Sequence, residues 1–214
     1  MSTMKRYAKP MTFLTPDELL ALLKTAREHS TRAWASILLA YKHGLRCSEV
    51  CDLRLADLDL KSNQITVRRL KGSMTNVQNL ERIQGQPLLD EPKAIKTWLT
   101  ERNDPSPYLF TSQKGGQLDR SAFFRLFQSV AKAAGLPQGK RNPHLVKHSL
   151  ASHMVAAGTN LAFIRQSLGH MSASSTARYC HVTDEQAATA VSYTHLDVYK
   201  RQIRLSGTVW RECP

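Results

Sequence analysis

The amino-acid sequence predicts a mainly α-helical protein with one small antiparallel β-sheet. Most of the chain repeats apolar residues at helical spacing, and several of these segments begin or end at residues typical of helix termini. In contrast, residues 64–70 (QITVRRL) alternate and are rich in β-branched residues, which is typical of a strand. The 214 residues suffice for one domain with a sizeable core, and no internal repeat divides them.

The front of the domain contains three predicted helices. Thr15 is followed by Pro16 and Glu18, an order typical of a helix N-terminus in which Thr15 and Glu18 form a capping box. Leucines at helical spacing follow. A second helix is predicted over residues 33–43, and a short third helix begins near Arg46.

The sheet and the remaining helices follow in order. The strand at 64–70 is expected to pair with residues 77–80 across a turn that contains Lys71. Gly135 and Gly158 lie where helices are expected to end. Further helices are predicted over residues 91–102, 119–134, 143–157, 160–168 and 172–180.

Two terminal segments differ from the domain. Residues 1–11 form a basic arm, and we expect the domain to span residues 12–191. Residues 192–214 contain SYTHLDVYKRQ, which has no clear periodicity and resembles a translated cloning or sequencing adapter. An unusual native tail is the alternative.

The charge of the chain points to a polyanionic partner. Thirty Lys and Arg against 17 Asp and Glu give a net charge of +13 and a pI near 9.9. Residues 192–214 hold four basic and two acidic residues, so most of the surplus lies outside the doubtful tail. Nucleic acid is the common partner of such a protein, although a basic surface can also serve solubility alone.

Composition argues against a membrane or metal protein. No apolar run approaches the roughly 20 residues that cross a bilayer, and no signal peptide is evident, so we expect a cytoplasmic protein. The cysteines lack zinc-ligand spacing, and Cys47 and Cys51 are expected to be reduced packing residues. We therefore expect neither a metal nor a cofactor.

The C-terminal third concentrates residues suited to phosphate chemistry. His144 and Lys147 are three apart on a predicted helix and share one face. His170 follows the end of the next predicted helix, and Tyr179 comes nine residues later. Cutting DNA without metal requires a side-chain nucleophile, cations that meet the charge on the phosphate oxygens, and a proton donor for the leaving 5′-oxygen.

Four strings carry a family resemblance: GLRCSEV, RRLKGS, HLVKHSLASHMVAAG and LGHMSASSTARYCHV. Their order and spacing resemble the catalytic domain of the tyrosine recombinases, or phage-type integrases, over about residues 13–191. The compact layout is most similar to the single-domain fimbrial phase-variation invertases. The resemblance implies the tyrosine recombinase fold in a protein of a bacterium or a mobile element. It also implies site-specific integration, excision or inversion of DNA through a 3′-phosphotyrosyl intermediate.

The resemblance assigns roles to individual residues. Arg46 would clamp the phosphate and Glu49 would support it, because a guanidinium fork suits two non-bridging oxygens. Lys147 stands where the family usually has a second arginine; it keeps the charge but loses the fork, so the copy is either active with a point charge or slow. The remaining roles are general acid for Lys71, proton transfer for His144, a phosphate hydrogen bond for His170 and nucleophile for Tyr179.

Other residues receive weaker interpretations. Arg68 and Arg69 alternate, so one is expected to face DNA and the other solvent. His148 is interpreted as a packing or orienting residue, and His153 and His181 as structural or surface residues. Phe123, Phe124 and Phe127 have helical spacing and are expected in the core. The candidate DNA-binding residues are Lys5, Arg6, Lys9, Arg68, Arg69, Lys140 and Arg141.

The expected partner is double-stranded DNA with specific recombination sites. The resemblance implies four protomers around two sites, with exchange of a C-terminal segment after the tyrosine. Two alternatives stay open: a catalytically weak or inactive DNA-binding relative that acts as a regulator or accessory factor, and a topoisomerase-like activity with the same residues.

Overall fold

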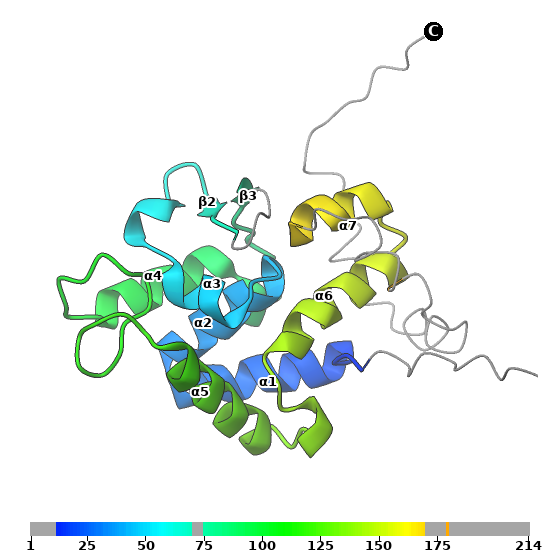
Figure 1. Ribbon diagram of the computed structural model, residues 1–214, viewed down its shortest axis with the longest axis horizontal. Coiled ribbons are helices and arrows are strands. Elements are labelled where there is room, and N and C mark those ends of the chain that lie inside the picture. Colours follow the sequence, from blue (N-terminus) through cyan, green and yellow to red (C-terminus); the bar gives the residue numbers. More distant parts are fainter. Residues whose placement is uncertain (1–11, 70–74, 170–178, 180–214) are drawn as a thin grey trace, which may run out of the picture.

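The computed structural model describes residues 12–69, 75–169 and Tyr179, and these form a mainly helical domain with one small sheet (Figure 1). Its α-helices are α1 (Pro16–His29), α2 (Thr31–Lys42), α3 (Cys47–Asp52), α4 (Glu91–Glu101), α5 (Arg120–Ala133), α6 (His144–Ala156) and α7 (Leu161–Leu168). Short 3₁₀ turns are η1 (Leu55–Asp57), η2 (Pro87–Leu89) and η3 (Gln138–Lys140). The strands are β1 (Leu58–Asp59), β2 (Gln64–Val67) and β3 (Asn76–Asn79).

Helix α1 begins as the sequence predicts. The Thr15 hydroxyl accepts a hydrogen bond from the Glu18 amide, and the Glu18 carboxylate accepts one from the Thr15 amide. Two otherwise unpaired amides are thereby satisfied. The predicted ends at Gly135 and Gly158 are also confirmed, because α5 and α6 end shortly before them.

Helix α2 is the centre of the core. Its residues are buried from Ala33 to Lys42, and it packs against α1, α4 and α6. A helix that is apolar nearly all round must be enclosed in this way. Phe123 and Phe127 of α5 are buried as expected, whereas Phe124 is only half-buried.

The sheet is antiparallel, in the order β1-β2-β3, with Thr66 opposite Val77. The prediction missed β1, because a two-residue strand shows no alternation. Strand β2 also ends at Val67, three residues earlier than expected. Figure 1 shows the end of α7 beside β3, where the Asn76 side chain donates a hydrogen bond to the Gln166 carbonyl.

Helix α6 is attached to the beginning of the described chain through the backbone of Leu14. The Leu14 amide donates to the Ser149 hydroxyl at 2.8 Å, and the Leu14 carbonyl accepts from Nε2 of His153 at 2.8 Å. Because Nε2 of His153 must carry the proton, Nδ1 of the neutral ring accepts the Tyr41 hydroxyl at 2.9 Å. These bonds fix α6 against α1 and α2. His153 is thus a structural residue, as predicted.

Of the predicted helix at 172–180, only Tyr179 is among the described residues. Among the described helices, none has the length and apolar character needed to cross a membrane. Cys47 and Cys51 are both free thiols.

Candidate active site

One half of the candidate site is an arginine and carboxylate cluster at the start of α3. The Glu49 carboxylate accepts the Arg46 amide at 2.8 Å and the Arg46 guanidinium at 2.7 Å. The Glu49 side chain is 1% exposed, whereas that of Arg46 is 33% exposed. Glu49 therefore supports Arg46 from the interior and leaves part of its guanidinium open to a ligand.

Arg69 belongs to the same cluster, and this corrects a prediction. Its side chain is 0% exposed and donates to the Glu49 carboxylate at 3.1 Å, so it faces neither DNA nor solvent. The two side chains do alternate, because Arg69 is buried like Ile65 and Val67 while Arg68 is exposed; the prediction was wrong because the second face is the protein interior. Arg68 is the open member of the pair, 56% exposed and ion-paired to Asp57 at 2.7 Å.

Lys147 contributes a buried amine beside this cluster. Its Nζ donates to the Leu168 carbonyl at the end of α7, at 2.9 Å. Burial lowers the pKa of Lys147 to about 7; the charges of Arg69 and Arg46 act in the same direction, and Glu49 opposes them. The amine is thus near its midpoint of protonation at neutral pH.

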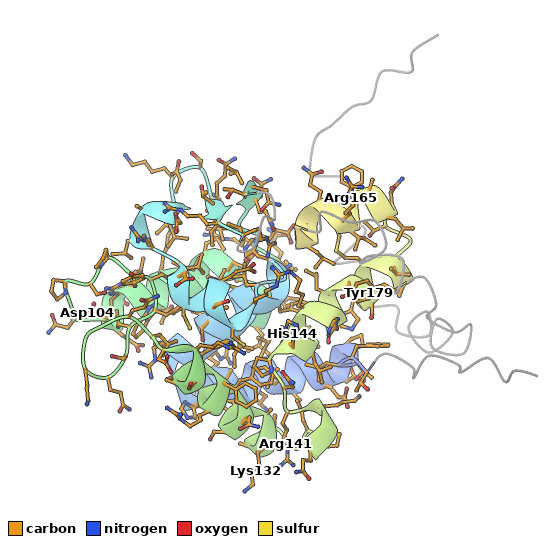
Figure 2. The ribbon with its side chains drawn as sticks, viewed as in Figure 1. Asp104, Lys132, Arg141, His144, Arg165 and Tyr179 are labelled. Atoms are coloured by element: carbon orange, nitrogen blue, oxygen red, sulfur yellow. The ribbon has the colours of Figure 1, made fainter. Side chains whose placement is uncertain are left out.

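The other half of the site consists of the aromatic side chains of His144, His148 and Tyr179. Nδ1 of His148 lies 2.8 Å from the Tyr179 hydroxyl, and their ring centroids are 5.8 Å apart. The His144 ring packs edge-on against His148, with centroids 5.4 Å apart. Figure 2 shows His144 and Tyr179 beside the same helix, α6. The two histidines are four residues apart and lie one helical turn apart on the same face. The three aromatic rings of Tyr179, His148 and His144 are therefore in successive contact.

The two halves meet electrostatically at His144. Partial desolvation lowers the pKa of His144, and the charges of Lys147, Arg46 and Arg120 lower it further. Burial alone would raise the pKa of Glu49, but the Arg46 amide and the charges of Arg69 and Lys147 lower it overall. The site therefore holds an ionised carboxylate, several cations and a neutral-leaning imidazole.

Sequence reasoning missed two members of this arrangement. His148 was interpreted as packing or orienting, yet it contacts the candidate nucleophile, and its position beside Lys147 was the available signal. Arg120 begins α5, and its charge reaches both His144 and Cys47. Nothing in the local sequence around Arg120 relates it to residues so distant in the chain.

Several predicted site residues lie elsewhere. Lys140 pairs with Glu18 at 2.7 Å, and Arg141 donates to the Leu136 carbonyl. Figure 2 shows Arg141 at the lower end of the molecule, well separated from Tyr179. Outside the described residues lie Lys5, Arg6, Lys9, Lys71, His170 and His181.

Comparison with known sequences gives the class of protein. Residues 12–186 match the profile of the phage integrase family. The chain therefore belongs to the phage integrase, or tyrosine recombinase, family, whose members cleave and rejoin DNA.

Individual relatives are consistent with this membership. The chain is 33% identical over 186 residues to tyrosine recombinase XerA of Pyrococcus furiosus, covering 86% of this chain but only 62% of that relative. It is 34% identical over 169 residues to type 1 fimbriae regulatory protein FimB of Escherichia coli K12, covering 76% of this chain and 80% of FimB. The predicted similarity to fimbrial proteins is thus confirmed.

Solved structures show the same fold. A crystal structure of XerA recombinase superposes with a TM-score of 0.72 at 28% identity, covering 91% of this chain and 66% of that one. A post-cleavage complex of XerH site-specific recombinase with palindromic difH DNA gives a TM-score of 0.69 at 23% identity, covering 86% and 54%. The predicted tyrosine recombinase fold is confirmed.

Proposed function

We propose that this chain is a site-specific DNA recombinase that cleaves and rejoins DNA through a 3′-phosphotyrosyl intermediate on Tyr179. The observation that carries the proposal is that the Tyr179 hydroxyl lies 2.8 Å from Nδ1 of His148 on a helix whose His144 and Lys147 interact electrostatically with Arg46. A nucleophile beside a base, with cations nearby, is the arrangement that phosphoryl transfer requires.

The proposed cleavage step transfers one phosphoryl group. The Tyr179 oxygen forms a bond to phosphorus while the bond from phosphorus to the 5′-oxygen breaks, and the phenolic proton passes to His148. The 5′-oxygen takes a proton from a general acid, for which we propose Lys71. Arg46 and Lys147 stabilise the charge on the non-bridging oxygens, with His170 as a further donor. Rejoining is the reverse with a new 5′-hydroxyl, so the step consumes neither ATP nor a metal.

Tyr179 is buried in the described chain, with 2% of its surface exposed. Its hydroxyl must therefore become accessible when DNA binds. This requirement makes cleavage dependent on the correct DNA complex and protects other phosphates from attack.

One observation favours a second candidate function, that of a catalytically weak DNA-binding relative acting as a regulator or accessory factor. The Lys147 amine is buried and already donates to the Leu168 carbonyl. An amine held in this way has less capacity for a phosphate than an arginine fork.

A covalent trapping assay separates the two functions. DNA nicked near the cleavage position loses a short fragment after attack, so a covalent protein–DNA adduct accumulates. If the chain is a recombinase, we expect an adduct that resists denaturant, and strand exchange when two complete sites are present. An electrophoretic shift without an adduct supports the regulator. Relaxation of supercoiled DNA without a partner site supports the topoisomerase-like alternative.

The proposed DNA contacts comprise the basic arm and the open arginine Arg68. Each phosphate neutralised contributes about −0.9 to the slope of log affinity against log salt. Removing residues 1–10 deletes Lys5, Arg6 and Lys9, so the slope should shrink by nearly three if all three contact phosphate. Identical slopes would show that the arm contacts no DNA.

Assembly on DNA is part of the proposal, and a solved structure of λ integrase contains a dimer bound to a COC′ core site. We propose a homotetramer on two recombination sites in the cytoplasm, with a catalytic domain that spans residues 12–191.

A further inference from the structure

Arg69 is the most extensively hydrogen-bonded buried cation described beside the site, and the reaction itself gives it no role. Its Nη1 donates to the Gly44 carbonyl at 3.0 Å and to the Glu49 carboxylate at 3.1 Å. Its Nη2 donates to the carbonyls of His43, at 2.7 Å, and of Ser167. One guanidinium thus joins three segments: the turn before Arg46, the start of α3, and the end of α7.

The positions of these acceptors concern Arg46 directly. His43 and Gly44 come just before Arg46 in the chain, and the Glu49 carboxylate holds both the amide and the guanidinium of Arg46. A shift of Arg69 therefore changes the backbone leading to Arg46 and the carboxylate that orients its side chain.

Two glycines allow close approaches, Gly169 to Arg69 and Gly44 to Leu168 at the end of α7. Gly169 has a φ of +64°, and a Cβ there would lie 2.9 Å from Cγ and Nε of Arg69. Gly44 has a φ of +55°, and a Cβ there would lie 2.7 Å from Cδ2 of Leu168. Both positions combine a left-handed backbone with a close approach, so a side chain at either would displace the end of α7 or Arg69.

The end of α7 is the third segment that Arg69 contacts. Its last carbonyls accept from side chains of separate elements: Asn76 bonds Gln166, Arg69 and Gln78 bond Ser167, and Lys147 bonds Leu168. Cations are favourable at this negative end of the helix dipole. Arg69 therefore ties the α2–α3 turn to the same helix end that Lys147 contacts.

We propose that Arg69 is a positioning residue that holds Arg46 in the orientation for phosphate contact, by fixing Glu49 and the 43–44 backbone against the end of α7. The proposal rests on the proposed function in taking Arg46 as the phosphate ligand. Four acceptors on two nitrogens require a planar fork, so lysine would not replace it.

The test compares DNA with an ordinary scissile phosphate and DNA with a methylphosphonate at that position. The methyl group removes the negative charge that Arg46 would neutralise, so an Arg46 defect matters less on methylphosphonate. Arg69→Met and Arg69→Lys should lower cleavage of the phosphate about 10–100-fold, as for loss of an orienting partner. On methylphosphonate DNA, the cleavage rates of both variants should fall much less relative to the unmodified protein, as should the rate of Arg46→Ala.

Arg102→Met is the matched control. The side chain of Arg102 is also largely enclosed, 5% exposed, and donates to backbone carbonyls and to Asp104. Figure 2 places Asp104 on the far side of the molecule from His144 and Tyr179. Arg102→Met should lower stability without changing the ratio of the two cleavage rates.

Binding provides a measurement that does not depend on cleavage. In a Tyr179→Phe background, the preference for phosphate over methylphosphonate DNA should fall when Arg69 is replaced. If the unmodified protein forms no adduct but this preference still depends on Arg69, the proposed function fails and the positioning role stands. If Arg69→Met lowers cleavage of both DNAs equally and leaves the binding preference unchanged, Arg69 is only structural and the inference is wrong.

Discussion

Two histidines of helix α6 each contact a tyrosine from another part of the chain, and the two contacts have nearly equal geometry. Nδ1 of His148 lies 2.8 Å from the Tyr179 hydroxyl, and Nδ1 of His153 lies 2.9 Å from the Tyr41 hydroxyl. Their surroundings differ. His153 is 3% exposed, and its second nitrogen is bonded to the Leu14 carbonyl, which fixes the tautomer. His148 is half-buried and packs against His144, which interacts with the charges of Lys147 and Arg46.

The difference shows that a histidine–tyrosine hydrogen bond does not itself define an active site. Burial lowers the pKa of His153 to about 4, so that ring stays neutral and serves as a fixed connector between α6, α2 and Leu14. The His148 pair has the same bond beside a group of cations. We propose that the charge around the pair, rather than the hydrogen bond itself, distinguishes a catalytic contact from packing.

Removing the two tyrosine hydroxyls should give the largest contrast. Tyr179→Phe should abolish covalent adducts and leave DNA binding nearly unchanged, because only the nucleophilic oxygen is lost. Tyr41→Phe should keep the adduct rate but destabilise the fold by about 1–3 kcal/mol, since a buried ring nitrogen loses its partner. Adduct yield on nicked DNA and urea unfolding measure the two effects. Adduct formation by Tyr179→Phe at the unmodified rate would refute the assignment.

The next contrast replaces the two histidines. His148→Gln should lower the single-turnover cleavage rate by about 10²-fold or more, because glutamine cannot take the phenolic proton. His153→Gln should change stability while folded molecules cleave at the unmodified rate. Equal cleavage by the two variants would mean that His148 is another packing residue.

Much of the fold follows from local signals, whereas the site follows only in part. Capping at Thr15 and helix ends near Gly135 and Gly158 depend on neighbouring residues, so the sequence contains them. Arg69 continues the buried face of Ile65 and Val67, but its acceptor at the end of α7 lies about 100 residues later, and no local signal indicates it. His148 and His153 could not be separated, because the partner of each is 31 and 112 residues away.

Substitution of Lys147 tests whether the positive charge near the His148–Tyr179 pair is needed for cleavage. Lys147→Ala should lower cleavage by about 10²-fold, as for loss of one oxyanion donor, and Lys147→Arg should keep or raise it. Because the pKa of Lys147 is about 7 in the free protein, its positive charge is lost as pH rises through that range. Bound phosphate raises this pKa, so the cleavage rate of the unmodified protein should decline only at a pH above the pKa of the free protein, and this decline should be absent in Lys147→Arg. Normal cleavage by Lys147→Ala would place the residue outside the site.

The last prediction concerns the pH dependence of stability. The folded-state pKa of His153 is about 4 against an ordinary value of 6.5, so between these values the unfolded chain binds a proton that the native protein does not. The contribution of His153 to the free energy of unfolding is therefore constant above about pH 6.5. It falls by roughly 3 kcal/mol as the pH drops to about 4. Unfolding of the unmodified protein and His153→Gln across this range should differ in slope. Parallel curves would contradict the neutral buried ring.

We propose that Tyr179, and not its structural counterpart Tyr41, attacks DNA. Trapping the protein on nicked DNA, digesting the adduct with protease and nuclease, and sequencing the modified peptide by mass spectrometry identifies the attached residue. We expect a nucleotide on Tyr179 within the peptide that contains ARYCHV. A nucleotide on Tyr41, or on any of the other tyrosines of the chain, would contradict it.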